Sequence, residues 1–283
     1  MYDGVRVVWH CIEHLHAVTY FDEGCRAANR EAGLAGFWMG YFASRAAPLG
    51  PVGPGVVEAV FFNFSPAMVR RAIPSAWSLA DPSDLVDRRR RSAANALRRI
   101  VPEIGQAATE LVPVLAGCTA RAPGEGRPLF SANRDLGVAA DPVEVLWQLA
   151  TTLREHRGDG HVAVLCAHGL SGLEAHQLIA AEHGTPPSLF RTSRGWSEDE
   201  WARSARGLVA SGLLDADGRM TGEGARLRAA VEERTDALAC SAYQHLEETG
   251  LARLVRVLRP PAVAVARSGV IPYPNPMGLP PLG

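Results

Sequence analysis

The sequence has almost no excess charge, no closely paired cysteines and no long hydrophobic run. Its 29 lysines and arginines nearly balance 30 aspartates and glutamates, so it lacks the strongly basic character typical of nucleic-acid-binding chains. Its five cysteines form no C-x-x-C pair, which argues against a disulfide framework or a zinc knuckle. No stretch approaches the roughly 18 uncharged apolar residues expected of a membrane span, so no membrane partner is predicted.

Several functional signatures are missing as well. The segment from Met1 to His16 contains Asp3 and Glu13 and has no cleavage site, so we expect no signal peptide and a cytoplasmic protein. There is no G-x-S-x-G elbow, no Walker phosphate loop and no G-x-G-x-x-G after a strand. Hydrolase triads, P-loop nucleotidases and Rossmann dehydrogenases are therefore not indicated.

The residues that are present indicate a mainly α protein. Apolar residues make up 47% of the 283 residues, which is enough for buried cores, and the length corresponds to about two domains. We predict a helical domain over residues 1–140 and a winged helix-turn-helix domain over residues 141–267. The Pro-rich tail over residues 268–283 is expected to be extended and to lie across the molecule as a lid or clasp.

The clearest local pattern lies in residues 187–239. Ser197 and Glu200 have the spacing of a capping box at the start of a helix. Residues 213–220 predict a small β-hairpin with Asp-Gly at its turn, and Thr221 then caps a long helix. Helix, turn, helix, two-stranded wing and helix is the order of a winged helix-turn-helix.

Short stretches along the chain together resemble an actinobacterial family of helix-turn-helix proteins with no established reaction. They are HAVTYF (16–21), GFW (36–38), RAAPLG (45–50), REHRGDGH (154–161), RGWS (194–197) and PNPMG (274–278). The resemblance spans nearly the whole chain and implies a helix-turn-helix fold. The wing region by itself resembles the C-terminal half of MarR-type regulators.

The second helix of the predicted motif carries the wrong charge for DNA. Such helices present basic or amide side chains to base edges. Here Glu198, Asp199 and Glu200 begin the helix, and two arginines further along only partly offset them. We therefore predict that nucleic acid is not its partner and that the fold is reused, because a fold alone does not fix a function.

An arginine run at residues 88–91 is the most basic stretch. Residues 81–101 contain six arginines and three aspartates. We interpret this stretch as a solvated helix face whose arginines pair with nearby acids. A contact with phosphate or nucleic acid is the alternative.

The nine histidines are unevenly distributed. His10, His14 and His16 lie within seven residues, but His14 and His16 point about 200° apart on a helix, so a regular helix cannot bring all three to one metal. The position of His16 among apolar residues, about one turn before Tyr20, predicts that it faces inward. It is either a core histidine or a contact to a ligand, haem or substrate.

The segment from Arg154 to His161 is polar or glycine at every position. We predict that Gly158 and Gly160 break the helix here and allow a ligand to approach. The alternatives are an exposed loop, an anion site with a bidentate arginine, and a metal site. The candidate residues of this segment are Arg154, His156, Arg157 and Asp159 for ligand binding and His161 for catalysis.

Two further groups are candidates for ligand contact. Trp38, Tyr41 and Arg45 recur at helical spacing, where an arginine can stack on an aromatic ring or clamp an acid. Asn63 is a polar amide among phenylalanines and needs a partner, either backbone or ligand. Plain core packing is the alternative for the aromatic stripe.

These candidates combine into one leading hypothesis. We predict a small-molecule-binding protein, specifically an enzyme of specialised metabolism (biosynthesis), that reuses a winged-helix fold around a pocket lined by histidine and arginine. His16 and His161 are the catalytic candidates. The ligand-binding candidates are Tyr20, Trp38, Tyr41, Arg45, Asn63, Arg154, His156, Arg157 and Asp159.

Two alternatives stay open. A MarR-like, ligand-responsive regulator would form a homodimer and bind specific duplex DNA with an affinity that falls steeply with salt. A haem or divalent-metal protein would use the N-terminal histidines.

Overall fold

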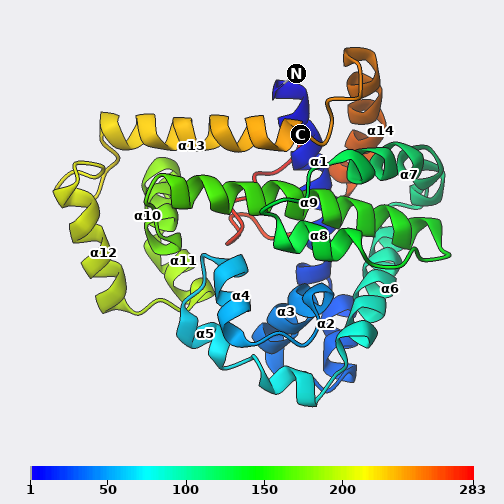
Figure 1. Cartoon of the computed structure of the whole chain (residues 1–283), viewed down its shortest axis with the longest axis horizontal. Coiled ribbons are helices and arrows are strands. Elements are labelled where there is room, and N and C mark those ends of the chain that lie inside the picture. Colours follow the sequence, from blue (N-terminus) through cyan, green and yellow to red (C-terminus); the bar gives the residue numbers. More distant parts are fainter. Residues whose placement is uncertain (1) are drawn as a thin grey trace.

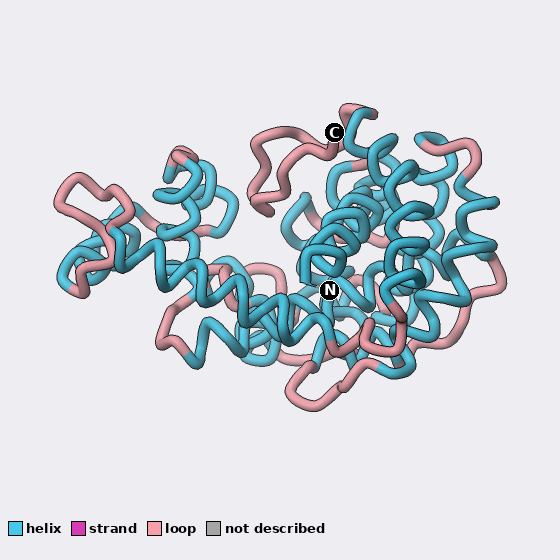
Figure 2. The backbone as a smooth tube through the Cα atoms, turned by 90° about the horizontal axis from the view of Figure 1, so that it is seen from above, coloured by secondary structure: helices cyan, strands magenta, loops and turns pink. Residues whose placement is uncertain are grey.

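The structure, a computed structural model, describes residues 2–283, with side chains from residue 4 onward. Fourteen α-helices and two short 3-10 helices make up the regular structure of these residues. Figure 2 shows only helices and loops in the part of the chain that is described. The prediction of a mainly α protein is therefore confirmed.

The longest helix, α9 (Pro142–Ala167), runs through the middle of the molecule (Figure 1). Asp141 caps its start by accepting hydrogen bonds from the amides of Val143 and Glu144. It packs most extensively against five other helices, α1 (Tyr2–Phe21), α6 (Pro82–Ile100), α7 (Ile104–Arg121), α8 (Pro128–Arg134) and α13 (Gly222–Cys240). Its polar side chains are therefore distributed among several interfaces.

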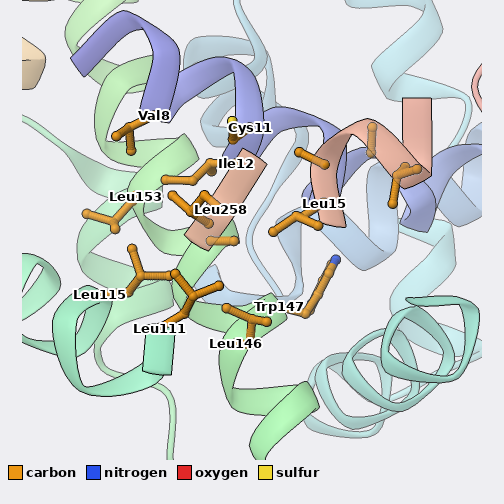
Figure 3. Packing of buried hydrophobic residues seen from close by; sticks show 14 of the residues in the cluster. Val8, Cys11, Ile12, Leu15, Leu111, Leu115, Leu146, Trp147, Leu153 and Leu258 are labelled. Carbon is orange, nitrogen blue, oxygen red and sulfur yellow. The ribbon is translucent and has the colours of Figure 1, made fainter. Parts of the chain in front are cut away.

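The largest hydrophobic core lies where α1, α7, α9 and α14 (Glu248–Arg267) meet. Leu15, Leu111, Trp147 and Leu258 are fully buried in it (Figure 3). A second core is built around the aromatic residues of α3 and α4 and the segment after them. The elements around it are α2 (Glu23–Glu31), α3 (Gly36–Ala46), η1 (Ala47–Leu49), α4 (Pro54–Phe61), α5 (Pro66–Arg70) and η2 (Ser75–Ser78).

The predicted break at residues 157–160 is wrong, because α9 continues through both glycines. The reason is tertiary packing. A Cβ at Gly160 would lie 2.6 Å from Nη1 of Arg127, and this buried guanidinium donates to the carbonyl of His156. Gly160 therefore makes room for the side chain of Arg127 at the start of α8. Because of this packing, the low helix propensity of glycine destabilises the buried helix less than it would destabilise a helix in solution.

The helix-turn-helix region consists of α10 (Gly172–His183), α11 (Pro187–Arg194), α12 (Glu198–Ala210) and α13, at one side of the molecule (Figure 1). Both predicted capping interactions of Ser197 and Glu200 are present. The predicted β-hairpin wing is wrong: residues 211–221 form a turn with a single antiparallel bridge between Leu214 and Met220. The side chain of Asp215 accepts the turn's amides, so the arms separate after one pair.

This region is anchored to the rest of the chain at α4. A Cβ at Gly172 would lie 2.2 Å from the carbonyl oxygen of Phe62, so only glycine lets α10 start this close to the backbone. Phe62 itself has a φ of 32°, a strained value for a residue with a side chain. Trp196 completes the contact by donating from Nε1 to the carbonyl of Asn63.

The Pro-rich tail lies across α1 and reaches α11. The Tyr273 hydroxyl is 3.0 Å from Nε2 of His14 on α1. Asn275 is buried and folds the tail by bonding the backbone of Met277 and Leu279. The carbonyl of Pro276 accepts a hydrogen bond from Arg194 on α11. In the described part of the chain, no helix is long and apolar enough to cross a bilayer.

Candidate functional site

A buried ion network joins α1, α3 and α9. Glu155 of α9, 1% exposed, accepts two hydrogen bonds from Arg45 of α3, both of 3.0 Å. It also accepts one from Arg154 at 3.0 Å, and Arg154 in turn pairs with Glu13 of α1 at 3.2 Å. Burial alone would raise the pKa of Glu155, but Arg45 and Arg154 outweigh that effect and lower it, so the carboxylate stays ionised.

His16 and Tyr20 lie next to this network. The ring of His16 bonds Oγ1 of Thr151 through Nδ1 and the Tyr20 hydroxyl through Nε2, each at 2.9 Å. It also stacks on Trp147, with ring centres 5.9 Å apart. Burial, followed by the charge of Arg154, lowers the pKa of His16 well below its ordinary value. His16 is therefore a neutral, fully bonded histidine that holds the Tyr20 hydroxyl in place.

Two tyrosines face each other beside Arg45. The ring centres of Tyr20 and Tyr41 are 4.9 Å apart, and the Tyr41 hydroxyl accepts from Nη1 of Arg45 at 3.1 Å. Burial and the proximity of Tyr41 raise the pKa of Tyr20, so the Tyr20 phenol stays neutral at ordinary pH. The carbon centre of the Arg45 guanidinium lies 4.3 Å from the ring centre of Phe61.

Arg194 at the end of α11 approaches the same place from the helix-turn-helix region. It is 8% exposed and lies 4.6 Å from the ring centre of Phe64, which in turn is 5.3 Å from the ring of Tyr41. Its acceptors are backbone carbonyls, those of Ser193 and Pro276, and its Nε has no partner. Among the described side chains, no carboxylate pairs with it.

The charges of this network act on Arg194 as well. Burial is the main cause that lowers the pKa of Arg194 to about 10, with Tyr41 opposing the shift and Arg45 and Arg154 adding to it. We call Arg45, Arg154, Arg194, Tyr20, Tyr41, Glu155 and Glu13 the arginine cluster. It combines residues from α1, α3, α9 and α11.

The structure brings together only part of the predicted site. His16, Tyr20, Tyr41, Arg45 and Arg154 meet in or beside the arginine cluster. Trp38 lies at its edge, 5.7 Å from Tyr41 between ring centres. Asn63 lies at the junction with α10, where its side-chain nitrogen is 3.4 Å from Nε2 of His176.

The other predicted residues of α9 point elsewhere. His156 faces α8, with its ring 4.9 Å from that of Phe130, and Asp159 accepts the backbone amide of Phe130. Burial lowers the pKa of His156 to about 3 and raises that of Asp159 to about 7.

Arg157 and His161 face α13. Arg157 lies over the ring of Trp9 at 4.0 Å and pairs with Asp236, while His161 bonds Thr235. His161 follows Thr151, the partner of His16, by ten residues, which is roughly 15 Å along a helix. The two catalytic candidates therefore cannot act on one small reacting centre.

The three N-terminal histidines also diverge. The ring of His10 is tilted against that of Trp9, His14 bonds the backbone of His10 and the hydroxyl of Tyr273, and His16 bonds Thr151. Among the described residues, no group of three or more metal-binding side chains comes together. These residues therefore do not form a set of three ligands for a divalent metal. The haem hypothesis, which needs as few as one axial ligand, stays a prediction.

Three residues near this site had no clear signal in the sequence. Glu13 and Arg89 come from helices distant in the chain, and Arg89 and Arg90 are buried although the run at 88–91 predicted a solvated face. Arg194 did have a signal, because it opens the R-G-W-S stretch at 194–197 that carries part of the family resemblance.

A model of the helix-turn-helix family matches residues 5–272. The chain belongs to the helix-turn-helix family. The match includes every residue of the arginine cluster, so the cluster lies inside the family's matched region. Searches of curated proteins and of solved structures found no match.

The helix predicted from the sequence as the second helix of the motif is α12, and one of its charges has a partner on a neighbouring helix. Glu198, at its start, lies 3.4 Å from Arg191 of α11. The turn that follows α12 has its own pair, Arg219 with Asp217 at 2.6 Å. Arg203 is exposed, but three carboxylates precede it in the first turn.

A cleft of about 570 Å³ separates α12 from the α4–α5 segment. Glu200 and Arg203 line it on one side, and Phe62 and Phe64 line it on the other. Part of the surface that would have to enter a DNA groove therefore borders a cleft within the same chain.

Proposed function

We propose that this helix-turn-helix family member is a small-molecule-binding protein whose ligand is an anion held by the arginine cluster. The observation that carries the proposal is Arg194, a buried arginine that has backbone carbonyls as its only acceptors among the described residues. Burying a charge without a counter-charge is unfavourable by several kcal/mol, on the order of the desolvation cost of an ion. A bound anion would remove that cost.

The chemistry of the site supports an anionic ligand. Arginine binds carboxylate and phosphate through a planar fork of donors, and it does so best where water is excluded. Arg154 is 17% exposed at its side chain and Arg45 is 11% exposed, so both lie close to the surface without being surface residues. The Tyr20 and Tyr41 hydroxyls add neutral donors.

The roles of the histidines change under this proposal. His16 is a positioning residue, because both ring nitrogens are already bonded and its contact with the ligand would pass through Tyr20. His161, His156, Arg157 and Asp159 belong to interhelical contacts on other faces of α9.

DNA binding is the second candidate function, and family membership favours it. It requires α12 to place Arg203 and Arg206 against a duplex while three carboxylates occupy the same end of the helix. Because phosphate contacts dominate DNA affinity, those carboxylates would weaken every such contact.

Native mass spectrometry of the freshly purified protein, together with fluorescence anisotropy on duplex DNA at two salt concentrations, tests both candidates. We expect an added mass of a few hundred daltons or less on the monomer or dimer, on the scale of a small ligand, and no salt-sensitive DNA binding. Ligand-free protein that binds duplex DNA with a steep salt dependence would contradict the proposal.

A further inference from the structure

The number of charges at the arginine cluster restricts what its ligand can be. Arg45, Arg154 and Arg194 are accompanied by two carboxylates, which form ion pairs with Arg45 and Arg154: those of Glu13 and Glu155. Glu155 is shared by Arg45 and Arg154, and Glu13 pairs with Arg154 alone. This part of the network carries one uncompensated positive charge, at Arg194.

A fourth buried arginine adds to it. Arg89 of α6 is 6% exposed and donates to the carbonyl of Ser44 and to the side-chain oxygen of Asn133, both neutral groups. Its guanidinium lies 5.6 Å from the ring of Trp147, on which His16 also stacks. Its Nε has no partner.

The remaining titratable groups nearby do not change the sum. His16 is neutral, since burial lowers its pKa, and Tyr20 is neutral, since burial raises its pKa. Asp159, one turn after Glu155 on α9, faces α8 beside the opposite charge of Arg127, so the ionised pair adds no net charge to the sum. Four arginines and two glutamates therefore leave an excess of two positive charges in a water-excluded region.

Unused donors mark where a ligand would be held. Arg194 Nε has no acceptor, and Nη2 of Arg194 uses the uncharged carbonyl of Pro276. Arg154 uses Nε and Nη1 for Glu13 and Glu155, which leaves Nη2 without a protein acceptor among the described residues. An anion that reached both arginines would take these donors and replace the Pro276 carbonyl on Arg194.

We propose that the ligand of the arginine cluster presents a dianionic phosphate monoester group, with Arg194 and Arg154 as its principal donors. This inference rests on the proposed function and goes beyond it by fixing the charge and chemical class of the ligand. A carboxylate would neutralise only half of the excess charge, whereas a phosphate monoester carries close to two negative charges at neutral pH. Displacement of the tail at Pro276 accompanies binding.

Isothermal titration calorimetry at constant ionic strength tests this, with inorganic phosphate, acetate and malonate as probes. We expect phosphate to bind the unmodified protein at least tenfold more tightly than acetate or malonate does. Arg194→Gln should weaken phosphate binding at least tenfold. Arg191→Gln, an arginine one turn earlier on α11 that is already paired with Glu198, is the matched control and should leave it unchanged.

The outcomes separate the two proposals. Equal binding of acetate and phosphate would overturn the dianion and leave the anion site standing. Tighter binding of malonate than of phosphate would replace the phosphate ester by a dicarboxylate and also overturn this inference. If none of the three anions binds, the proposed function falls as well. Arg194→Lys keeps the charge without the planar fork, so intermediate phosphate affinity in this variant would show that the protein still folds and that the fork matters.

Discussion

The arginine cluster and the surface of the helix-turn-helix region use the same residue types in opposite ways. On α12 and its neighbours, arginines and carboxylates are exposed and paired locally, as Arg219 is with Asp217. In the arginine cluster the charges are buried, come from four helices, and include Arg194 without a carboxylate. Exposed pairs of this kind contribute little to stability, whereas buried charges must be compensated. This difference is the reason why we propose the ligand site in the buried region.

The largest effect expected from this contrast concerns buried histidines. Burial lowers the pKa of six of them: His10, His14, His16, His156, His161 and His176. A histidine whose folded pKa lies below the unfolded value contributes stability that is lost as pH falls below about 6.5. Unfolding would take up as many as six protons, so we expect stability to fall by up to about 8 kcal/mol per pH unit below that point.

Urea unfolding curves between pH 7.5 and pH 5 measure this slope. A cooperative loss of structure near the lower end is the expected result. A free energy of unfolding that hardly changes over this interval would mean that the histidines are not held neutral. It would contradict the conclusion that water is excluded around α9.

The second prediction compares one carboxylate from each region. Glu155→Gln leaves Arg45 and Arg154 without their shared partner, and breaking a buried ion pair in this way costs about 3–5 kcal/mol. Glu198→Gln on α12 removes an exposed partner of Arg191 and should change stability by no more than about 0.5 kcal/mol. Chemical denaturation of the two variants at pH 7.5 checks the difference. Equal losses of stability in the two variants would contradict the distinction between buried charges in the arginine cluster and exposed charges on α12.

The smallest expected effect concerns the cap of α12 in the helix-turn-helix region. Ser197→Ala removes the cap of α12 and should cost about 1 kcal/mol, because the amide of Glu200 loses its acceptor. Phosphate binding measured by calorimetry should not change, since α12 contributes no residue to the arginine cluster. Weakened phosphate binding in this variant would show that the helix-turn-helix region and the cluster are coupled.

Local chemistry made much of the fold predictable. The caps at Asp22, Asp141, Ser171 and Ser197 depend on neighbouring residues alone, and all four are present. The wing and the break in α9 were mispredicted for the opposite reason. Gly158 and Gly160 look like helix breakers in the sequence, but Arg127 packs against Gly160, and the side chains of Glu155 and Arg154 lie beside Gly158. The arms of the turn at residues 211–221 pair over a single bridge, and the Asp215 side chain holds the turn between them.

The site was less predictable than the fold because its residues come from separate helices. His16 and Tyr20 are one turn apart on α1, and Tyr41 and Arg45 are one turn apart on α3, so each pair could be recognised. The meeting of these pairs with Arg194 depends on how α11 is docked against α4 and the tail. The polar run at 154–161 predicts a single ligand site, but these residues lie in a helix, and a helix distributes neighbouring residues over all its faces.

A crystal structure of the protein grown with inorganic phosphate tests the central claim most directly. The account predicts phosphate bound between Arg154 and Arg194, with the carbonyl of Pro276 displaced from the Arg194 guanidinium. Phosphate found only on exposed arginines such as Arg91, with Arg194 still bonded to Pro276, would contradict it.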